Sequence, residues 1–180
     1  MTLSGPILAI DAATRSGFCV GLPNDKPRSG SVVLKKPGEH RRIAFENFHA
    51  WISDEFQKYI PALIVVEDIL PLQAFKRVHS STDNIRLQYG LHSIIEMMSW
   101  RHGLRIPLAV NPATVRKHFL GRSNMGDRAA TKAAVVRRAQ ALGYIPKDCF
   151  DHDRSDAVSL WDFAMATHAG RIPSELVMFM

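Results

Sequence analysis

Cysteine is scarce in this chain, and long apolar runs are missing. The two cysteines, Cys19 and Cys149, do not make a disulfide framework, so the fold is expected to depend on its core. No run of about eighteen apolar residues occurs, which argues against a membrane span. The first six residues, Met1 to Pro6, lack the basic start and long apolar segment of a signal peptide. These absences favour a reduced, cytoplasmic setting.

Zinc-like spacing is also missing. The histidines at 79, 92, 102 and 118 are scattered, and neither cysteine lies in a ligand motif. Apolar residues make up 46% of the chain and charged residues 22%, which is enough for a full core and argues against disorder. A length of 180 residues fits one domain, so we expect residues 1–180 to form a single domain.

Positive charge exceeds negative charge, with a formal net charge of +6. The basic residues recur in short groups, at Lys35–Lys36, Arg41–Arg42, Lys76–Arg77, Arg116–Lys117, Arg122, Arg128, Lys132 and Arg137–Arg138. The acidic residues that are candidates for a site, Asp11, Glu67, Asp153 and Asp156, lie outside these basic groups. A small acidic focus on a broadly positive surface suits a polyanion that is both held and cut.

Hydrophobic periodicity predicts alternating strands and helices. Short apolar runs predict strands, and apolar residues at helical spacing predict helices. Strands are expected over 7–10, 16–22, 29–34, 63–66 and 106–110, and helices over 41–59, 83–101, 112–120, 128–142 and from Asp151 or Asp153 to about 168. Gly17 is expected to help the tight turn before the second strand. A meander followed by a mixed β/α half predicts a three-layer α/β domain.

Four carboxylates, far apart in the chain, stand where these elements begin or end. Asp11 follows the apolar run Pro6–Ile10, and Glu67 ends another. Asp153 and Asp156 are three residues apart at a helix start, so they share one helical face. Buried acids need a partner, and one divalent cation serves several at once. The sequence therefore predicts a metal site for phosphodiester chemistry, with Mg²⁺ as the favoured ion.

Each acid also has an ordinary structural interpretation. Asp151 is favoured as a helix N-cap, Asp11 alone suits a turn, and Glu67 alone suits a solvated strand end. His152 with Asp156, at i,i+4, is an alternative chelating pair. All four acids being ordinary together is the less favoured interpretation.

Two segments suit contact with nucleic acid. Phe75, beside Lys76 and Arg77 in a polar loop, is a candidate for base stacking. Lys132 follows another polar loop at the start of an Ala-rich helix, whereas Arg137 and its neighbour suit a solvated helix face.

Taken in order, these segments resemble the RuvC-type Holliday junction resolvases, over most of the chain. The matching stretches are Ile7–Val20 for the first hairpin, Val65–Glu67 for the central acidic strand, Leu87–Gly90 for the helix after it, Val115–Gly121 with Ala129–Lys132 for the basic DNA-contact region, and Asp153–Ala157 for the closing acidic pair. Each motif alone is weak evidence for this family, and their occurrence in the same order is more specific.

The resemblance implies a ribonuclease H-like three-layer fold, with a mixed five-stranded sheet and helices on both faces. It implies a homodimer that nicks opposed strands of a four-way DNA junction with Mg²⁺, for which Mn²⁺ would substitute. By position it assigns metal ligation and catalysis to Asp11, Glu67, Asp153 and Asp156, phosphate contact to Lys132, and DNA contact to Arg116 and Lys117. The helix over 83–101, apolar on more than one side, is the predicted dimer contact.

The chain departs from the family pattern at two places. The loop between Gly121 and Lys132 is longer than usual, and Ile69 and Leu70 stand where an aromatic residue is expected after the central acid. The cleavage-sequence preference therefore stays open, and a phage-like or otherwise divergent member is indicated. Three alternatives also remain: a ribonuclease H-like nuclease for hybrids or branched DNA, a sugar-kinase-like phosphotransferase, and a junction-binding protein without catalysis.

Overall fold

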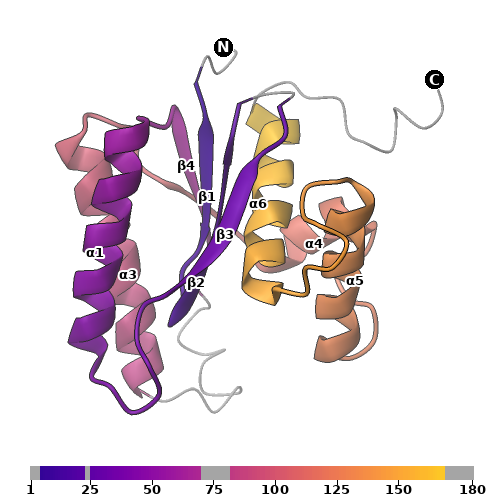
Figure 1. Ribbon diagram of the computed structural model, residues 1–180, viewed down its shortest axis with the longest axis horizontal. Coiled ribbons are helices and arrows are strands. Elements are labelled where there is room, and N and C mark those ends of the chain that lie inside the picture. The colour runs from indigo at the N-terminus through magenta and orange to yellow at the C-terminus, as the bar shows by residue number, and fades with distance from the viewer. Residues whose placement is uncertain (1–4, 23–24, 70–81, 169–180) are drawn as a thin grey trace.

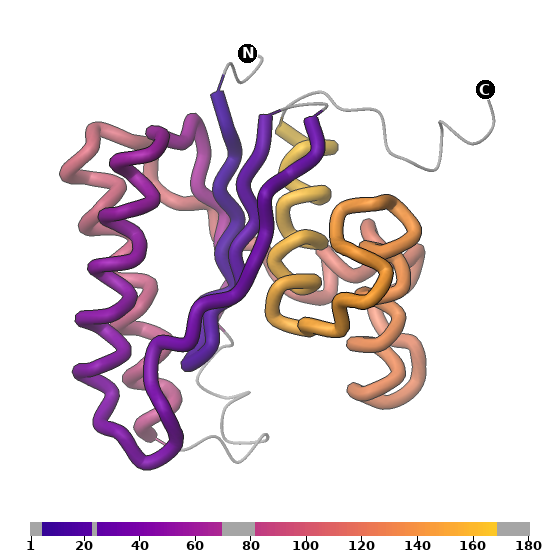
Figure 2. The backbone as a smooth tube through the Cα atoms, in the orientation of Figure 1, coloured from indigo at the N-terminus to yellow at the C-terminus, as the bar shows by residue number. Residues whose placement is uncertain are grey.

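The computed structural model describes residues 5–22, 25–69 and 82–168. They form a mixed sheet with helices on both faces (Figure 1; Figure 2). The strands are β1 (Ile7–Asp11), β2 (Arg15–Gly21), β3 (Arg28–Val33), β4 (Leu63–Glu67) and β5 (Leu108–Val110), and the helices are α1 (Arg41–Lys58), α3 (Thr82–Arg101), α4 (Pro112–Leu120), α5 (Arg128–Ala141) and α6 (His152–His168). None of the helices in these ranges is long and apolar enough to cross a membrane.

The sheet has the order β3-β2-β1-β4-β5, which confirms the mixed five-stranded prediction. Strands β1, β2 and β3 form an antiparallel meander, and β4 pairs in parallel with both β1 and β5. Parallel pairing of Ile10 with Val66 places the next residues, Asp11 and Glu67, at the same edge of the sheet. The two acids that end separate apolar runs are therefore neighbours in space.

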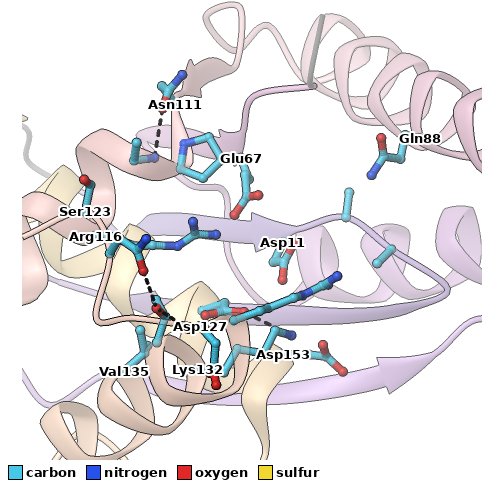
Figure 3. A pocket seen from close by; sticks show the side chains of 18 of the residues that line it. Asp11, Glu67, Gln88, Asn111, Arg116, Ser123, Asp127, Lys132, Val135 and Asp153 are labelled. Atoms are coloured by element: carbon cyan, nitrogen blue, oxygen red, sulfur yellow. Dashed lines mark hydrogen bonds and ion pairs between the residues drawn. The ribbon is translucent and has the colours of Figure 1, made fainter. Parts of the chain in front are cut away.

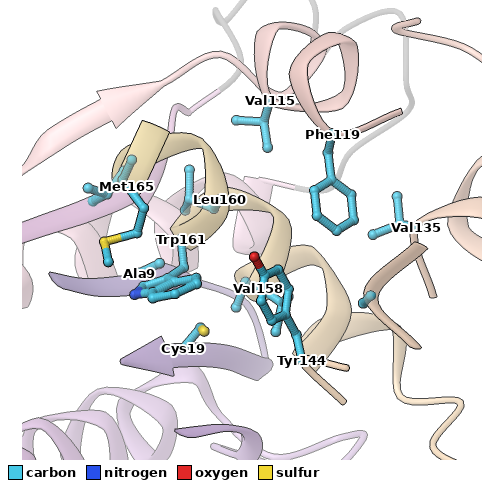
Figure 4. Packing of buried hydrophobic residues seen from close by; sticks show 14 of the residues in the cluster. Ala9, Cys19, Val115, Phe119, Val135, Tyr144, Val158, Leu160, Trp161 and Met165 are labelled. Atoms are coloured by element: carbon cyan, nitrogen blue, oxygen red, sulfur yellow. The ribbon is translucent and has the colours of Figure 1, made fainter. Parts of the chain in front are cut away.

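Alternation along β1 divides the core into two layers. Ile7 and Ala9 pack with α4, α5 and α6, whereas Leu8 and Ile10 pack with α1 and α3. Figure 4 shows Ala9 and Cys19 of the sheet against Trp161 of α6, whose ring is fully buried. The three-layer prediction is confirmed, and α6 lies directly on the sheet.

Two details of the sequence-based description change, and a third prediction is not tested. Gly17 lies within β2, and the bend before it at 12–14 is held by Ser16, whose hydroxyl donates to the Ala13 carbonyl at 2.9 Å. Strand β5 begins at Leu108, because Ile106 is 85% exposed and pairs with no strand of the described sheet. Phe75, with its basic neighbours Lys76 and Arg77, lies outside the described residues.

Candidate active site

All four predicted carboxylates line one pocket, a cavity of about 940 Å³. Asp11 comes from the end of β1, Glu67 from the end of β4, and Asp153 and Asp156 from the first turns of α6. Figure 3 shows the labelled acids around the same open space. Strand ends and a helix start thus bring together side chains that lie far apart in the sequence.

Gly17 explains how α6 comes so close to the sheet. A Cβ atom at this position would collide with the backbone carbonyl of Asp153. Gly17 also pairs directly with Asp11 across the β1–β2 hairpin. The missing side chain therefore lets the first turn of α6, with its two acids, lie beside the end of β1.

A polar network anchors the start of α6. The Asp151 carboxylate accepts the backbone N–H of Arg154 at 3.1 Å, as an N-cap residue does. It also accepts the Ser31 hydroxyl at 2.6 Å and the Arg15 guanidinium at 2.8 Å. Desolvation works to raise the pKa of Asp151, but these hydrogen bonds outweigh it and the pKa lies below its usual value. Asp151 is thus an anchor of the helix, as the N-cap interpretation predicted.

Arg15 reaches past this anchor to the pocket. Its Nε lies 3.5 Å from the Asp153 carboxylate, so one guanidinium joins Asp151 to Asp153. His152, between them, is exposed and is not among the residues that line the cavity. The geometry favours the pair Asp153 and Asp156 over the alternative pair that includes His152.

The pocket acids repel one another. Desolvation first, and then the charges of Glu67, Asp156 and Asp153, raise the pKa of Asp11 well above its usual value. Desolvation, followed by the charge of Asp156, raises the pKa of Glu67 to about 7. Desolvation also raises the pKa of Asp156, although Lys132 works against it. A cation among these groups would relieve both the desolvation and the repulsion.

Three basic residues, Arg116, Arg128 and Lys132, form a cationic wall of the same cavity. The Lys132 ammonium lies 3.7 Å from the Asp156 carboxylate, and Arg116 of α4 faces the same cavity. Arg128, which the sequence analysis did not select, also lines it. Its spacing of four residues from Lys132 on one helix was the available signal. Lys117 is exposed and is not one of the lining residues.

The donor type fits Mg²⁺, which prefers hard oxygen ligands such as carboxylates. Among the described residues, no three His, Cys, Asp or Glu side chains already form a ligand set. The acids would therefore have to turn toward a shared ion, and their position on one cavity wall allows this. Asp11, Glu67, Asp153 and Asp156 are the residues that would hold it.

Comparison with known proteins assigns the fold. No protein-family model matches the sequence, and no curated protein matches it. The arrangement of sheet and helices is the ribonuclease H-like fold of the RuvC type, which solved structures share despite low sequence identity.

Three solved structures illustrate the likeness. Thermus thermophilus RuvC superimposes with a TM-score of 0.66 at 15% identity, over 92% of this chain and 96% of that one. The same protein in complex with a Holliday junction substrate gives a TM-score of 0.67 at 13% identity, over 91% of this chain and 97% of that one. The yeast mitochondrial Holliday junction resolvase Ydc2 gives a TM-score of 0.55 at 13% identity, over 100% of this chain and 86% of that one. The fold predicted from the sequence is therefore confirmed.

Proposed function

We propose that this chain is a metal-dependent, structure-selective DNA endonuclease that resolves four-way junctions. The observation that carries the proposal is the convergence of four carboxylates, with raised pKa values at three of them, in one cavity with the cationic wall. The fold shared with RuvC, which has been solved with a Holliday junction substrate, supports branched DNA as the substrate class.

The acidic and the basic residues of the pocket have different roles in this proposal. The four acids hold Mg²⁺, or Mn²⁺ in its place, and the bound ion would polarise a phosphate and activate a water. Lys132 and Arg116 bind the phosphate backbone of the strand through their charge. Lys117, Phe75, Lys76 and Arg77 remain proposed DNA contacts.

Nicking of two opposed strands requires two sites, so we include a homodimer in the proposal. Helix α3 carries exposed apolar side chains at Tyr89, Met97 and Trp100, and Trp100 is 85% exposed. Their spacing puts them on one side of the helix, which supports α3 as the dimer contact.

The test compares Mg²⁺-dependent cleavage of four substrates: a four-way junction, a flap, an RNA–DNA hybrid and a linear duplex. We expect the junction to be cut fastest. Asp156→Asn should lower its cleavage by more than the roughly 10–100-fold that is typical of groups that only support a ligand. Asp54→Asn, at an exposed position on α1, is the matched control and should cut normally.

Two outcomes would change the proposal. Normal cleavage by Asp156→Asn would remove this residue from the site. Faster cleavage of the hybrid or the flap would favour the alternative, a ribonuclease H-like nuclease with another substrate.

A further inference from the structure

The wall of the pocket formed by α3 carries amides in place of charges. Asn84 and Gln88 both line the cavity, and their spacing of four residues puts them on one helical face. Figure 3 shows Gln88 across the open space from Arg116 and Lys132. Neither amide has a role in the proposed cleavage chemistry, so this wall needs its own explanation.

Gln88 has a buried acceptor that is unsatisfied. Within the described part of the chain, its Oε1 atom is buried and has no hydrogen-bond partner. Buried polar atoms are nearly always paired, because an unpaired one costs free energy. An unsatisfied amide at the wall of a substrate pocket points to a partner that arrives with the substrate.

Helix α3 cannot shift to relieve this atom. Leu87 and Leu91, on either side of Gln88, are buried in the core layer between α3 and α1. Gly90 lies so close to the Phe45 ring that a Cβ atom there would collide with it. The backbone of Gln88 is therefore fixed, and only the end of its side chain is free to reorient about a soft terminal torsion.

The chemistry of the amide selects the ligand. A phosphodiester offers only acceptors, and the cations Arg116 and Lys132, which lie across the open space from Gln88 in Figure 3, suit it. An unsatisfied acceptor needs a donor, and within a DNA strand the donors are the ring N–H and exocyclic amine groups of the bases. Glutamine can both donate to and accept from such an edge.

We propose that Gln88, with Asn84 one turn before it, contacts the edge of a nucleobase beside the phosphate held in the pocket, and so sets the cleavage-sequence preference. This rests on the proposed function, because it places DNA in the same pocket. With the cations on one wall holding the backbone, the amide wall faces the bases of the same strand.

The experiment uses Gln88→Met, which keeps the length of the side chain and removes its hydrogen bonds. Four-way junctions that differ only in the bases flanking the cleavage site are compared by kcat/KM in Mg²⁺ and by binding affinity. Gln57→Met, at an exposed position on α1, is the matched control. The thermal midpoint of each variant is measured as well.

We expect the wild-type protein to discriminate among these junctions by roughly 10- to 100-fold, the range of one good amide–base contact. In Gln88→Met the ratio of kcat/KM between the most and least favoured junctions should fall to about 3-fold or less, while the least favoured junction is cut as before. Its thermal midpoint should stay the same or rise, because the substitution removes an unsatisfied buried atom. Gln57→Met should keep the wild-type ratio.

Other results overturn the inference. The inference fails if Gln88→Met keeps the wild-type ratio of kcat/KM among the junctions. It also fails if the wild-type protein does not discriminate among them. A lower thermal midpoint with an equal loss on all junctions would assign Gln88 a structural role instead. Should the protein bind junctions without cutting them, the binding ratios decide the inference while the nuclease proposal fails. An absence of both binding and cutting overturns both.

Discussion

Glu67 ends β4 with its side chain in the pocket, where desolvation and then the charge of Asp156 raise its pKa from 4.5 to about 7. The folded protein therefore holds this proton more tightly than the unfolded chain does. The resulting stabilisation is present below pH 4.5 and is lost as the pH rises through about 7. Without a metal ion, the site destabilises the fold at neutral pH and above.

Replacement of this acid should reverse the effect. In EDTA above pH 7, we expect Glu67→Gln to be more stable than the wild-type protein, by on the order of 2–3 kcal/mol. For a chain of this size that raises the thermal midpoint by roughly 5–10 °C. The difference should vanish well below pH 4.5, where Glu67 is protonated in both states. Thermal unfolding across this pH range measures it, and Glu46→Gln on the exposed face of α1 is the control.

The wild-type protein should also gain stability from Mg²⁺, and Glu67→Gln should gain less. Equal thermal midpoints of the two proteins in EDTA above pH 7 would contradict the raised pKa. An equal gain from Mg²⁺ would contradict the assignment of Glu67 to the metal site.

At the scale of elements, one buried acid joins the helices behind the cationic wall. Asp162 of α6 is 6% exposed. It accepts the Tyr144 hydroxyl at 2.9 Å, and it lies 3.0 Å from Nε2 of His118 on α4. Helix α4 also carries Arg116 into the pocket. This buried group therefore connects helix α4, which carries Arg116 of the cationic wall, to helix α6, which carries two of the acids.

Tyr144→Phe tests this connection. The ring packs edge-on against Trp161 at 5.6 Å, and phenylalanine keeps that contact. Loss of the hydroxyl takes one donor from a buried carboxylate, so we expect a destabilisation of about 1–3 kcal/mol. Urea unfolding measures it, with Tyr89→Phe at an exposed position of α3 as the control. A neutral result would mean that other groups satisfy Asp162 without the tyrosine hydroxyl.

Local patterns were enough to predict most elements. The runs at Ile7–Ile10 and Leu63–Val66 became buried strands, because short apolar runs have few other stable environments. Helices α4 and α5 are capped by Asn111 and Asp127, whose side chains accept backbone N–H groups at 2.8 and 2.7 Å. The ends of parallel strands meet at one sheet edge, so Asp11 and Glu67 could be placed together as well.

The remaining parts of the site depend on contacts between distant segments, which leave no local pattern. Gly17 looked like a turn residue, and only the packing of α6 against β2 reveals why a side chain is excluded there. The contact of Arg15 with Asp151 joins the first hairpin to the last helix. The unsatisfied amide of Gln88 is visible only once the packing around α3 is known.

At the scale of the whole molecule, the net charge of +6 does not say where a bound DNA strand would lie. If the strand lies in the pocket, Arg116 releases counterions on binding, whereas Arg137, exposed on α5 and not among the lining residues, does not. We expect Arg116→Ala to reduce the slope of log affinity against log salt by about 1. Arg137→Ala removes the same charge and should leave the slope unchanged.

The measurement is equilibrium binding of a four-way junction over a salt series, in the Asp156→Asn background so that the strands stay intact. A local contact changes the slope only for the residue that meets a phosphate, whereas a general attraction depends on net charge and treats both variants alike. Equal slopes for Arg116→Ala and Arg137→Ala would therefore place the DNA on the broad basic surface. A difference confined to Arg116→Ala would place it in the pocket, where the carboxylates can act on it.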